Sequence, residues 1–308
     1  MRKHLKFKQY RHELQREYQK VYRIIKPLYQ QLVPLAIRHR HNYQHLVVSD
    51  VEIIATTILG QLHHFSSQLK WYQWLCRTRF ARRPFIERSR YNRRCRDLVN
   101  LISLLRQAYV QRVAGDFKYV IIDSLPMPLC QPVRNLTATR LRDYADIGFN
   151  SSKRTPFYGF KFHCLLTNQG FVLNWQLTAA SVHDSQVASD LLLSTGRDLV
   201  VLGDLGYLNQ PQQRDLRANG IILWTPKRSN MSPTESAQQT RRLKSYRKRI
   251  ETTFSSFTRS FNFEQPGSQT LTGIRLTVET ILFTHTMEVV HALGQGRYGF
   301  NLAGGILN

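Results

Sequence analysis

Two short apolar segments that each end on an aspartate constrain the fold of this chain most strongly. Residues 118–127, KYVIIDSLPM, run through three aliphatic side chains to Asp123, and residues 198–207, DLVVLGDLGY, reach Asp204 in the same way. Apolar runs of this length are typical of buried strands. If the two strands are neighbours, both aspartates emerge at the carboxyl edge of the sheet and can meet there to hold a metal. Turn or helix-capping chemistry is the alternative explanation for each aspartate taken alone.

The residues around these two segments alternate between strand and helix patterns. Strand patterns occupy residues 156–168, 170–180 and 221–226, and helical patterns occupy 181–194, 211–220 and 240–261. Asn168-Gln169-Gly170 separates the first two of these strands as a hairpin turn. The order predicts a mixed α/β sheet flanked by helices, which is compatible with a ribonuclease H-like fold.

The connection after Asp123 is unusually long, because about thirty residues separate it from the next predicted strand. Connections of this length are usually functional, and this one carries five basic side chains: Arg134, Arg140, Arg142, Lys153 and Arg154. We therefore expect a loop that faces the substrate. It also contains Asp143 and Asp146, which compete with Asp123 and Asp204 as candidate metal ligands.

The charge of the chain indicates a polyanionic partner. The net charge is +24, and residues 1–115 hold 23 basic against 6 acidic side chains, a net of +17. Such a surface usually neutralises nucleic-acid phosphates. A solvated basic face, a ribosome-associated protein or a membrane-surface protein would share this balance. The sequence lacks a signal-peptide pattern, an apolar run long enough for a membrane span and a CxxC pair.

The first 115 residues have helical patterns throughout. Residues 8–33 keep an apolar stripe, and Ser49 with Glu52 forms a capping box before a second apolar helix. The turn HHFSS and the segment QLKWYQWLCR follow, so the region is similar to a helix-turn-helix unit, although any small helical bundle has this pattern. We predict a helical, basic, DNA-end-binding domain at 1–115, a catalytic domain at 116–293 and a loose tail at 294–308.

Residues 84–113 concentrate arginines on one part of a helical pattern. Like charges at neighbouring positions of a helix repel each other, and one acidic neighbour, Asp97, cannot neutralise them. Contact with DNA phosphates explains the cluster better than stability does, and a solvated face is the alternative. The candidate DNA-binding residues here are Arg88, Arg90, Arg93, Arg94 and Arg96.

A third carboxylate is needed, because two aspartates bind Mg²⁺ poorly alone. Glu251 is the strongest candidate, since Ile250, Phe254 and Phe257 give its helix a face that can dock on the sheet, and Arg247 precedes it by one turn. An ordinary Arg–Glu surface pair is the alternative for these two residues. The other acids considered are Glu235 and Glu264, which fall in predicted loops, and Glu279 and Glu288, which we expect on an exposed helix face.

Taken together, these motifs resemble those of a known family. Asp123 after a strand, HDS at 183–185, GDLGY at 203–207 and R-x-x-x-E at 247–251 are similar to the DDE transposases of bacterial insertion sequences. The nearest branch is the 982-type, whose N-terminal half carries a stretch similar to IERSRYNRR at 86–94.

The resemblance implies a chemistry as well as a fold. It implies a ribonuclease H-like catalytic domain with Asp123, Asp204 and Glu251 holding two Mg²⁺ ions, for which Mn²⁺ can substitute. These ions would support hydrolysis at a transposon end and attack of the freed 3′ hydroxyl on target DNA. Lys161, Arg247, Lys227 and Arg228 are candidates for holding phosphates, and His183 is a possible accessory residue near the scissile phosphate.

The expected partners are double-stranded DNA at the transposon ends and at the target, with a homo-oligomer on DNA and no membrane. The expected location is the bacterial cytoplasm, in association with the nucleoid. Two other classes stay open: a ribonuclease H-like nuclease acting on branched or hybrid nucleic acid, and a non-enzymatic DNA-binding protein derived from a transposase.

Overall fold

A computed structural model describes most of the chain as two compact units. The described residues are 2–39, 43–78, 85–151, 153–196, 198–207, 210–226 and 237–296. The first unit comprises residues 1–109 and 270–284, and the second comprises residues 110–269 and 285–308. The predicted loose tail falls largely on 297–308, outside the described residues.

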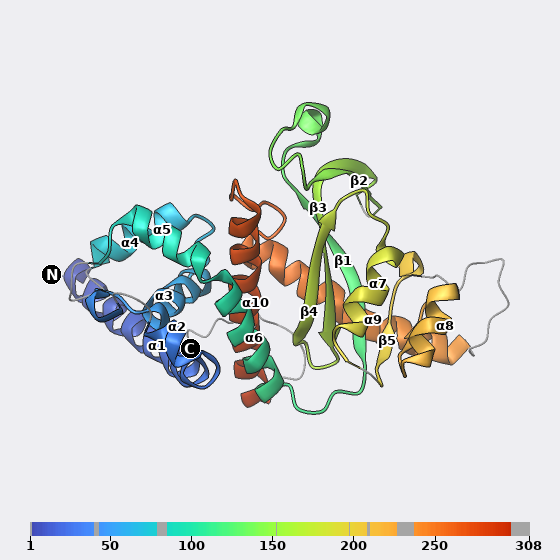
Figure 1. The fold of residues 1–308 in the computed structure, drawn as a ribbon, viewed down its shortest axis with the longest axis horizontal. Helices are drawn as coiled ribbons and strands as arrows, with labels where there is room; N and C mark the ends of the chain where they lie inside the picture. The colour runs from blue at the N-terminus through green and yellow to red at the C-terminus, as the bar shows by residue number, and fades with distance from the viewer. Residues whose placement is uncertain are drawn as a thin grey trace. The chain divides into compact units, whose positions relative to one another are not determined.

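The first unit is helical over its described residues (Figure 1). Its helices are α1 (Arg2–Leu32), α2 (Leu35–Arg38), α3 (Asp50–Leu62), α4 (Gln68–Thr78) and α5 (Arg88–Asp97), with the short η1 (Tyr43–His45) and parts of α6 (Val99–Val113) and α10 (Leu271–Gly294). The predicted capping box is present at the start of α3. Ser49 Oγ accepts a hydrogen bond from the Glu52 amide at 3.2 Å, and the Glu52 carboxylate accepts one from the Ser49 amide at 2.7 Å.

The core of the first unit lies between α1 and α3. Leu14, Val21 and Ile25 of α1 are at most 1% exposed, and Ile54 and Ile58 of α3 are fully buried. Every third or fourth residue of α1 thus faces the core, as its apolar stripe predicts.

One expectation about the first unit is wrong. Glu279 of α10 is not on an exposed face, because it is 2% exposed and its Oε2 accepts a 2.6 Å hydrogen bond from Arg106 Nε of α6. Arg106 is itself fully buried. Charged residues are rarely fully buried unless they are paired. The partner of Glu279 lies 173 positions away in sequence. Glu288, in the second unit, is half-buried, and burial raises its pKa to about 7.

The second unit is built on a six-stranded mixed sheet. The strands are β1 (Val120–Pro128), β2 (Asp146–Asn150), β3 (Thr155–Thr167), β4 (Val172–Ala179), β5 (Val200–Leu202) and β6 (Ile222–Trp224). Their order is β2-β3-β1-β5-β6, with β4 also paired to β3. β1, β5 and β6 run parallel to one another, whereas β1, β2 and β4 pair with β3 antiparallel. The mixed sheet confirms the predicted fold class for this part of the chain.

Helices cover both faces of this sheet (Figure 1). On one face, Val120 and Ile122 of β1 pack with Val187 and Leu191 of α7 (Asp184–Leu193) and with Leu216 of α8 (Gln210–Ala218). The opposite face is covered by α9 (Ala237–Phe261), whose predicted core residues Ile250, Phe254 and Phe257 are all buried.

The connection after Asp123 is more ordered than the sequence suggests. β1 continues beyond Asp123 to Pro128, where it still pairs with Gly159 of β3, and η2 (Pro132–Thr137) and β2 follow. The buried side chain of Asn135 fixes the segment, because it donates to the Pro156 carbonyl and accepts from the Tyr158 amide, each at 3.0 Å. The connection therefore contains regular secondary structure, and its role facing the substrate stays a prediction.

Two further sequence features have structural counterparts. Cys76, Cys95, Cys130 and Cys164 are free thiols. Among the described residues, no helix combines the length and apolar character that crossing a membrane requires.

Candidate active site

The strand register places Asp123 and Asp204 at equivalent positions of neighbouring parallel strands. Ile121 of β1 is paired with Leu202 of β5, and each aspartate lies two residues after its member of that pair. The two strands are therefore neighbours, as the sequence argument requires. Both aspartates follow the paired segment at the same edge of the sheet, where α/β sheets usually carry their sites.

Arg247 joins the two aspartates. Its Nη2 lies 3.7 Å from Asp123 Oδ2, and its Nη1 lies 3.4 Å from Asp204 Oδ1. The guanidinium comes from α9, the helix that covers the sheet face opposite α7 and α8. One cation is thus held between carboxylates from two strands, and Arg247 pairs with them rather than forming only a surface pair with Glu251.

The two carboxylates have different environments. Burial raises the pKa of Asp123 to about 7, and the negative charges of Asp204 and Asp184 add to this, while the Ser124 amide and Arg247 lower the pKa. Asp204 is more open to solvent, with 54% of its side chain exposed. Asp123 is half-buried, with 20% of its side chain exposed. The site therefore combines one half-buried carboxyl group with one that is more open to an incoming ligand.

Asp184 contacts Ser124, the residue after Asp123, and it is a site residue that the sequence analysis named only as part of the HDS motif. Its Oδ1 accepts from Lys161 Nζ at 2.9 Å, and its Oδ2 accepts from Ser124 Oγ at 3.2 Å. Lys161 also donates to the Val182 carbonyl at 2.8 Å. The structure therefore places Lys161, a predicted phosphate ligand, in an internal ion pair. The HDS motif was the signal in the sequence that could have identified this group.

His183 lies at the start of α7. It is the N-cap residue, and its Nδ1 accepts a hydrogen bond from the Ser185 amide at 3.3 Å. This is a helix-capping role. The role near the scissile phosphate stays a prediction.

The loop that carries Asp204 is anchored by Tyr207. This tyrosine is 1% exposed, and its hydroxyl lies 3.3 Å from Nδ1 of the fully buried His163. Burial lowers the pKa of His163 to about 4, so the ring is neutral near pH 7. Gly206 lies beside α7, where a Cβ would be in ordinary contact with the Asp184 carboxylate, 3.4 Å from its Oδ2. Tyr207 therefore holds the segment after β5 in place through its burial and its contact with His163.

Glu251 lies on α9 one helical turn after Arg247, and it is exposed. Within the described part of the chain, no group of three His, Cys, Asp or Glu residues is arranged to hold a metal ion. The structure brings Asp123 and Asp204 together around a cation, but it does not add Glu251 to a three-carboxylate cluster. The carboxylate oxygens of the pair are nevertheless the donors that Mg²⁺ prefers.

The middle of the chain matches a known family. Residues 114–266 match the family model of the transposase DDE domain. This match supports a DDE transposase. The matched segment includes β1 to β6, α7 to α9 and all three predicted catalytic residues. A search among curated proteins gave no match.

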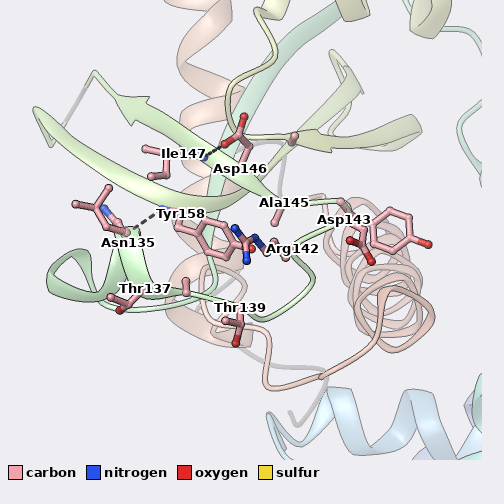
Figure 2. A pocket seen from close by; sticks show the side chains of 13 residues that line it. Asn135, Thr137, Thr139, Arg142, Asp143, Ala145, Asp146, Ile147 and Tyr158 are labelled. Atoms are coloured by element: carbon pink, nitrogen blue, oxygen red, sulfur yellow. Dashed lines mark hydrogen bonds between the residues drawn. The ribbon is translucent and has the colours of Figure 1, made fainter.

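Asp143 and Asp146, the rival carboxylates, lie elsewhere in the matched segment. They line a cavity of about 680 Å³ beside η2 and β2 (Figure 2). Asp146 Oδ1 accepts from the Ile147 amide at 2.7 Å, and a hydrogen bond from Ser181 lowers the pKa of Asp146. The cavity lining does not include Asp123, Asp204 or Glu251. Asp143 and Asp146 therefore belong to a different surface from the aspartate pair.

The predicted DNA-binding arginines outside the matched segment differ in exposure. Arg88, Arg90 and Arg93 of α5 are exposed, and Arg96 is half-buried. Arg94 instead turns inward, where it donates to Asp50 Oδ1 at 2.7 Å and to the Val48 carbonyl. Lys227, Arg228 and Glu235 lie outside the described residues.

Proposed function

We propose that this chain is a DNA transposase that binds the inverted-repeat ends of its insertion sequence and catalyses 3′-end cleavage and strand transfer. The observation that carries the proposal is the pair of aspartates on neighbouring parallel strands, joined by Arg247 inside a segment that matches the transposase DDE domain. Asp123 is half-buried with a raised pKa and lies beside the exposed Asp204 at a sheet edge. A perturbed titratable group in such a place favours a catalytic role.

Asp123 and Asp204 are the residues that would hold divalent metal ions, with Glu251 as the third carboxylate. Bound Mg²⁺ or Mn²⁺ would supply Lewis-acid activation of water and stabilisation of the departing 3′ oxygen. The donor chemistry of the aspartate pair fits such an ion. The assignment of Glu251 rests on its position one turn from Arg247 and on the family resemblance.

The residues of the site have separate tasks in this proposal. Arg247 holds both aspartates in place before substrate binds, and it offers a positive charge to a DNA phosphate that arrives on the exposed side of Asp204. Ser124 fixes Asp123 through its amide, which donates to Asp123 Oδ1 at 2.8 Å. The Ser124 hydroxyl donates to Asp184, and Lys161 in turn holds Asp184 through an ion pair.

The basic first unit is the part that would bind the transposon ends. Its surplus of arginines and lysines favours a protein that grips a duplex outside the cleavage site over a ribonuclease H-like nuclease acting alone. The assignment to the 982-type branch rests on residues 86–94, which form the start of α5 and the residues before it. Oligomerisation on DNA belongs to the same proposal.

The test is cleavage of duplexes that carry the ends of the element flanking this gene, in Mg²⁺ or Mn²⁺. We expect Asp123→Asn and Asp204→Asn each to abolish 3′-end cleavage and strand transfer while DNA binding is kept or tightened, because removing a negative charge lessens repulsion of phosphate. Asp143→Asn, which changes a carboxylate of the separate cavity, is the matched control and should stay active. Cleavage by either site variant, or cleavage in the presence of chelator, would contradict the proposal.

A further inference from the structure

Helix α4 packs across α3 at a point where only glycine fits. A Cβ on Gly60 of α3 would lie 2.9 Å from three atoms of the Trp71 ring of α4. Phe65 and Trp74 pack on the same tryptophan, with ring centroids 5.2 Å from it. The angle between the two helices is therefore fixed by aromatic packing, which leaves little freedom for α4 to turn about its own axis.

The link between the two helices is a tight turn. His64 adopts a left-handed conformation with φ of 57°, and the Phe65 amide returns to the Gly60 carbonyl at 3.0 Å. Ser67 then precedes α4, and its hydroxyl accepts from the Lys70 amide at 3.4 Å. A helix, a short turn with one left-handed residue and a second helix are the components of a helix-turn-helix unit.

The two faces of α4 differ in chemistry. Trp71, Leu75 and Thr78 are buried, at 3 to 5% exposure. The opposite face is exposed and carries the cations Lys70 and Arg77. The helix has no acidic residue that could neutralise them. The members of the exposed face are Leu69, Lys70, Gln73, Cys76 and Arg77.

The acidic residues of the first unit are mostly engaged elsewhere. Glu17 contacts His63 at 2.7 Å, Asp50 pairs with Arg94, and Glu52 and Glu87 accept from serines of their own helix starts. Acidic groups with such partners are poorly placed to neutralise the exposed cations of α4. The face therefore complements a polyanion.

Three exposed side chains lie together on the first two turns of α4. Lys70 and Gln73 are three positions apart, and Leu69 and Gln73 are four apart, so they are neighbours on one helix face. This set matches base edges in a major groove, since glutamine pairs with adenine, lysine with guanine, and an apolar group with the thymine methyl. Leu69 is 45% exposed, so its side chain is accessible for such a contact.

We propose that α4 is the recognition helix of this protein and that Lys70 and Gln73 read base edges in the major groove of duplex DNA. The inference rests on the proposed function, since it assumes that the first unit binds DNA. The exposed arginines of α5, namely Arg88, Arg90 and Arg93, then hold the phosphate backbone and carry no sequence information. Arg77, at the last turn of α4, belongs with the backbone contacts.

The experiment uses the full chain and two duplexes. Selection from a pool of random duplexes identifies the sequence preferred by the wild-type protein, and affinity for it is compared with affinity for a scrambled duplex at one salt concentration. We expect Gln73→Ala and Lys70→Ala each to reduce the ratio of the two affinities by about 5- to 100-fold, with little change on the scrambled duplex. Arg93→Ala should weaken binding to both duplexes by the same factor.

Gln30→Ala, an exposed glutamine of α1, is the matched control and should leave the ratio unchanged. Thermal unfolding of each variant shows whether its fold is kept. An unchanged ratio in Gln73→Ala, or wild-type protein that binds duplexes without sequence preference, overturns the inference and leaves DNA binding intact. Absence of salt-dependent binding to any duplex would instead overturn the DNA-binding part of the proposed function.

Discussion

At the scale of single residues, the site is a pair of unlike aspartates around one arginine. The Asp123 carboxylate accepts a hydrogen bond from the Ser124 amide, and burial raises its pKa. Asp204 is open to solvent. Glu251 is exposed, and its link to the pair is its position on α9 one turn after Arg247.

We expect Glu251→Gln to eliminate strand cleavage and to leave folding and DNA binding nearly unchanged. Glutamine keeps the shape and the hydrogen-bonding capacity of glutamate but lacks the charge that a divalent ion requires. The measurement is cleavage of transposon-end duplexes beside thermal unfolding. Glu264→Gln is the control, because Glu264 pairs with Lys153 at 2.9 Å away from the aspartate pair. If the Glu251→Gln variant still cleaves the duplexes, the third metal ligand is a residue other than Glu251.

At the scale of elements, α6 and α10 are joined by a fully buried ion pair. Arg106 Nε and Glu279 Oε2 are 2.6 Å apart, and neither side chain is more than 3% exposed. Such a pair costs desolvation when it forms, so its worth lies mainly in the penalty for breaking it.

We expect Glu279→Leu to lower the free energy of unfolding by about 3–5 kcal/mol, because it leaves the Arg106 charge buried without its carboxylate. The double variant Arg106→Met with Glu279→Leu removes both charges and should recover most of this loss. Chemical denaturation of the full-length variants measures both values. If the double variant were less stable than the single one, the pair would contribute net stability that apolar packing cannot replace.

Glu288, also on α10, makes stability depend on pH. Its pKa is raised by burial from 4.5 to about 7, so the folded chain keeps a proton there that the unfolded chain releases above 4.5. Stability therefore falls as the pH rises from about 4.5 to 7 and levels off above that range.

We expect Glu288→Gln, which resembles the protonated form, to be more stable than wild type at pH 8 by about 1–3 kcal/mol and nearly equal to it at pH 4.5. The free energy of unfolding across this range measures the effect. Glu87→Gln changes an exposed glutamate and should follow the wild-type curve. Parallel curves for wild type and Glu288→Gln would show that Glu288 keeps an ordinary pKa.

At the scale of the whole molecule, charge is distributed unevenly between the two parts of the chain. Residues 1–115 carry +17 of the total +24. The first compact unit also includes residues 270–284, which bring Glu279 to Arg106. A fragment ending at residue 115 would lack this partner, so the full chain is the appropriate material for binding measurements.

We expect the affinity of the full chain for duplex DNA to fall steeply with salt, because phosphate contacts release counterions. Arg93→Ala should reduce the slope of log K against log salt by about 1, since Arg93 is exposed on α5. Arg94→Ala should change the slope little and lower the melting temperature, because Arg94 pairs with buried Asp50. A flat slope for the wild-type chain would remove the basis for assigning this charge to phosphates.

The sequence by itself determined the local elements, and it singled out Asp123 and Asp204, which the structure brings together around Arg247. Apolar runs ending on Asp123 and Asp204, the capping box at Ser49 and the apolar stripe of α9 depend on neighbours in the chain, so patterns of hydrophobicity predict them. The family resemblance placed Asp123 and Asp204 in a DDE domain. The family match covers residues 114–266, which include both, and it supports a DDE transposase.

Only the tertiary structure decided which side chains meet. Arg94 and Arg93 are adjacent in sequence, yet one pairs with Asp50 and the other is exposed. Glu279 is buried because Arg106, distant in sequence, lies beside it, and Lys161 is engaged because Asp184 starts the next helix. The burial of a charge depends on its partner in space, and packing between distant segments supplies that partner.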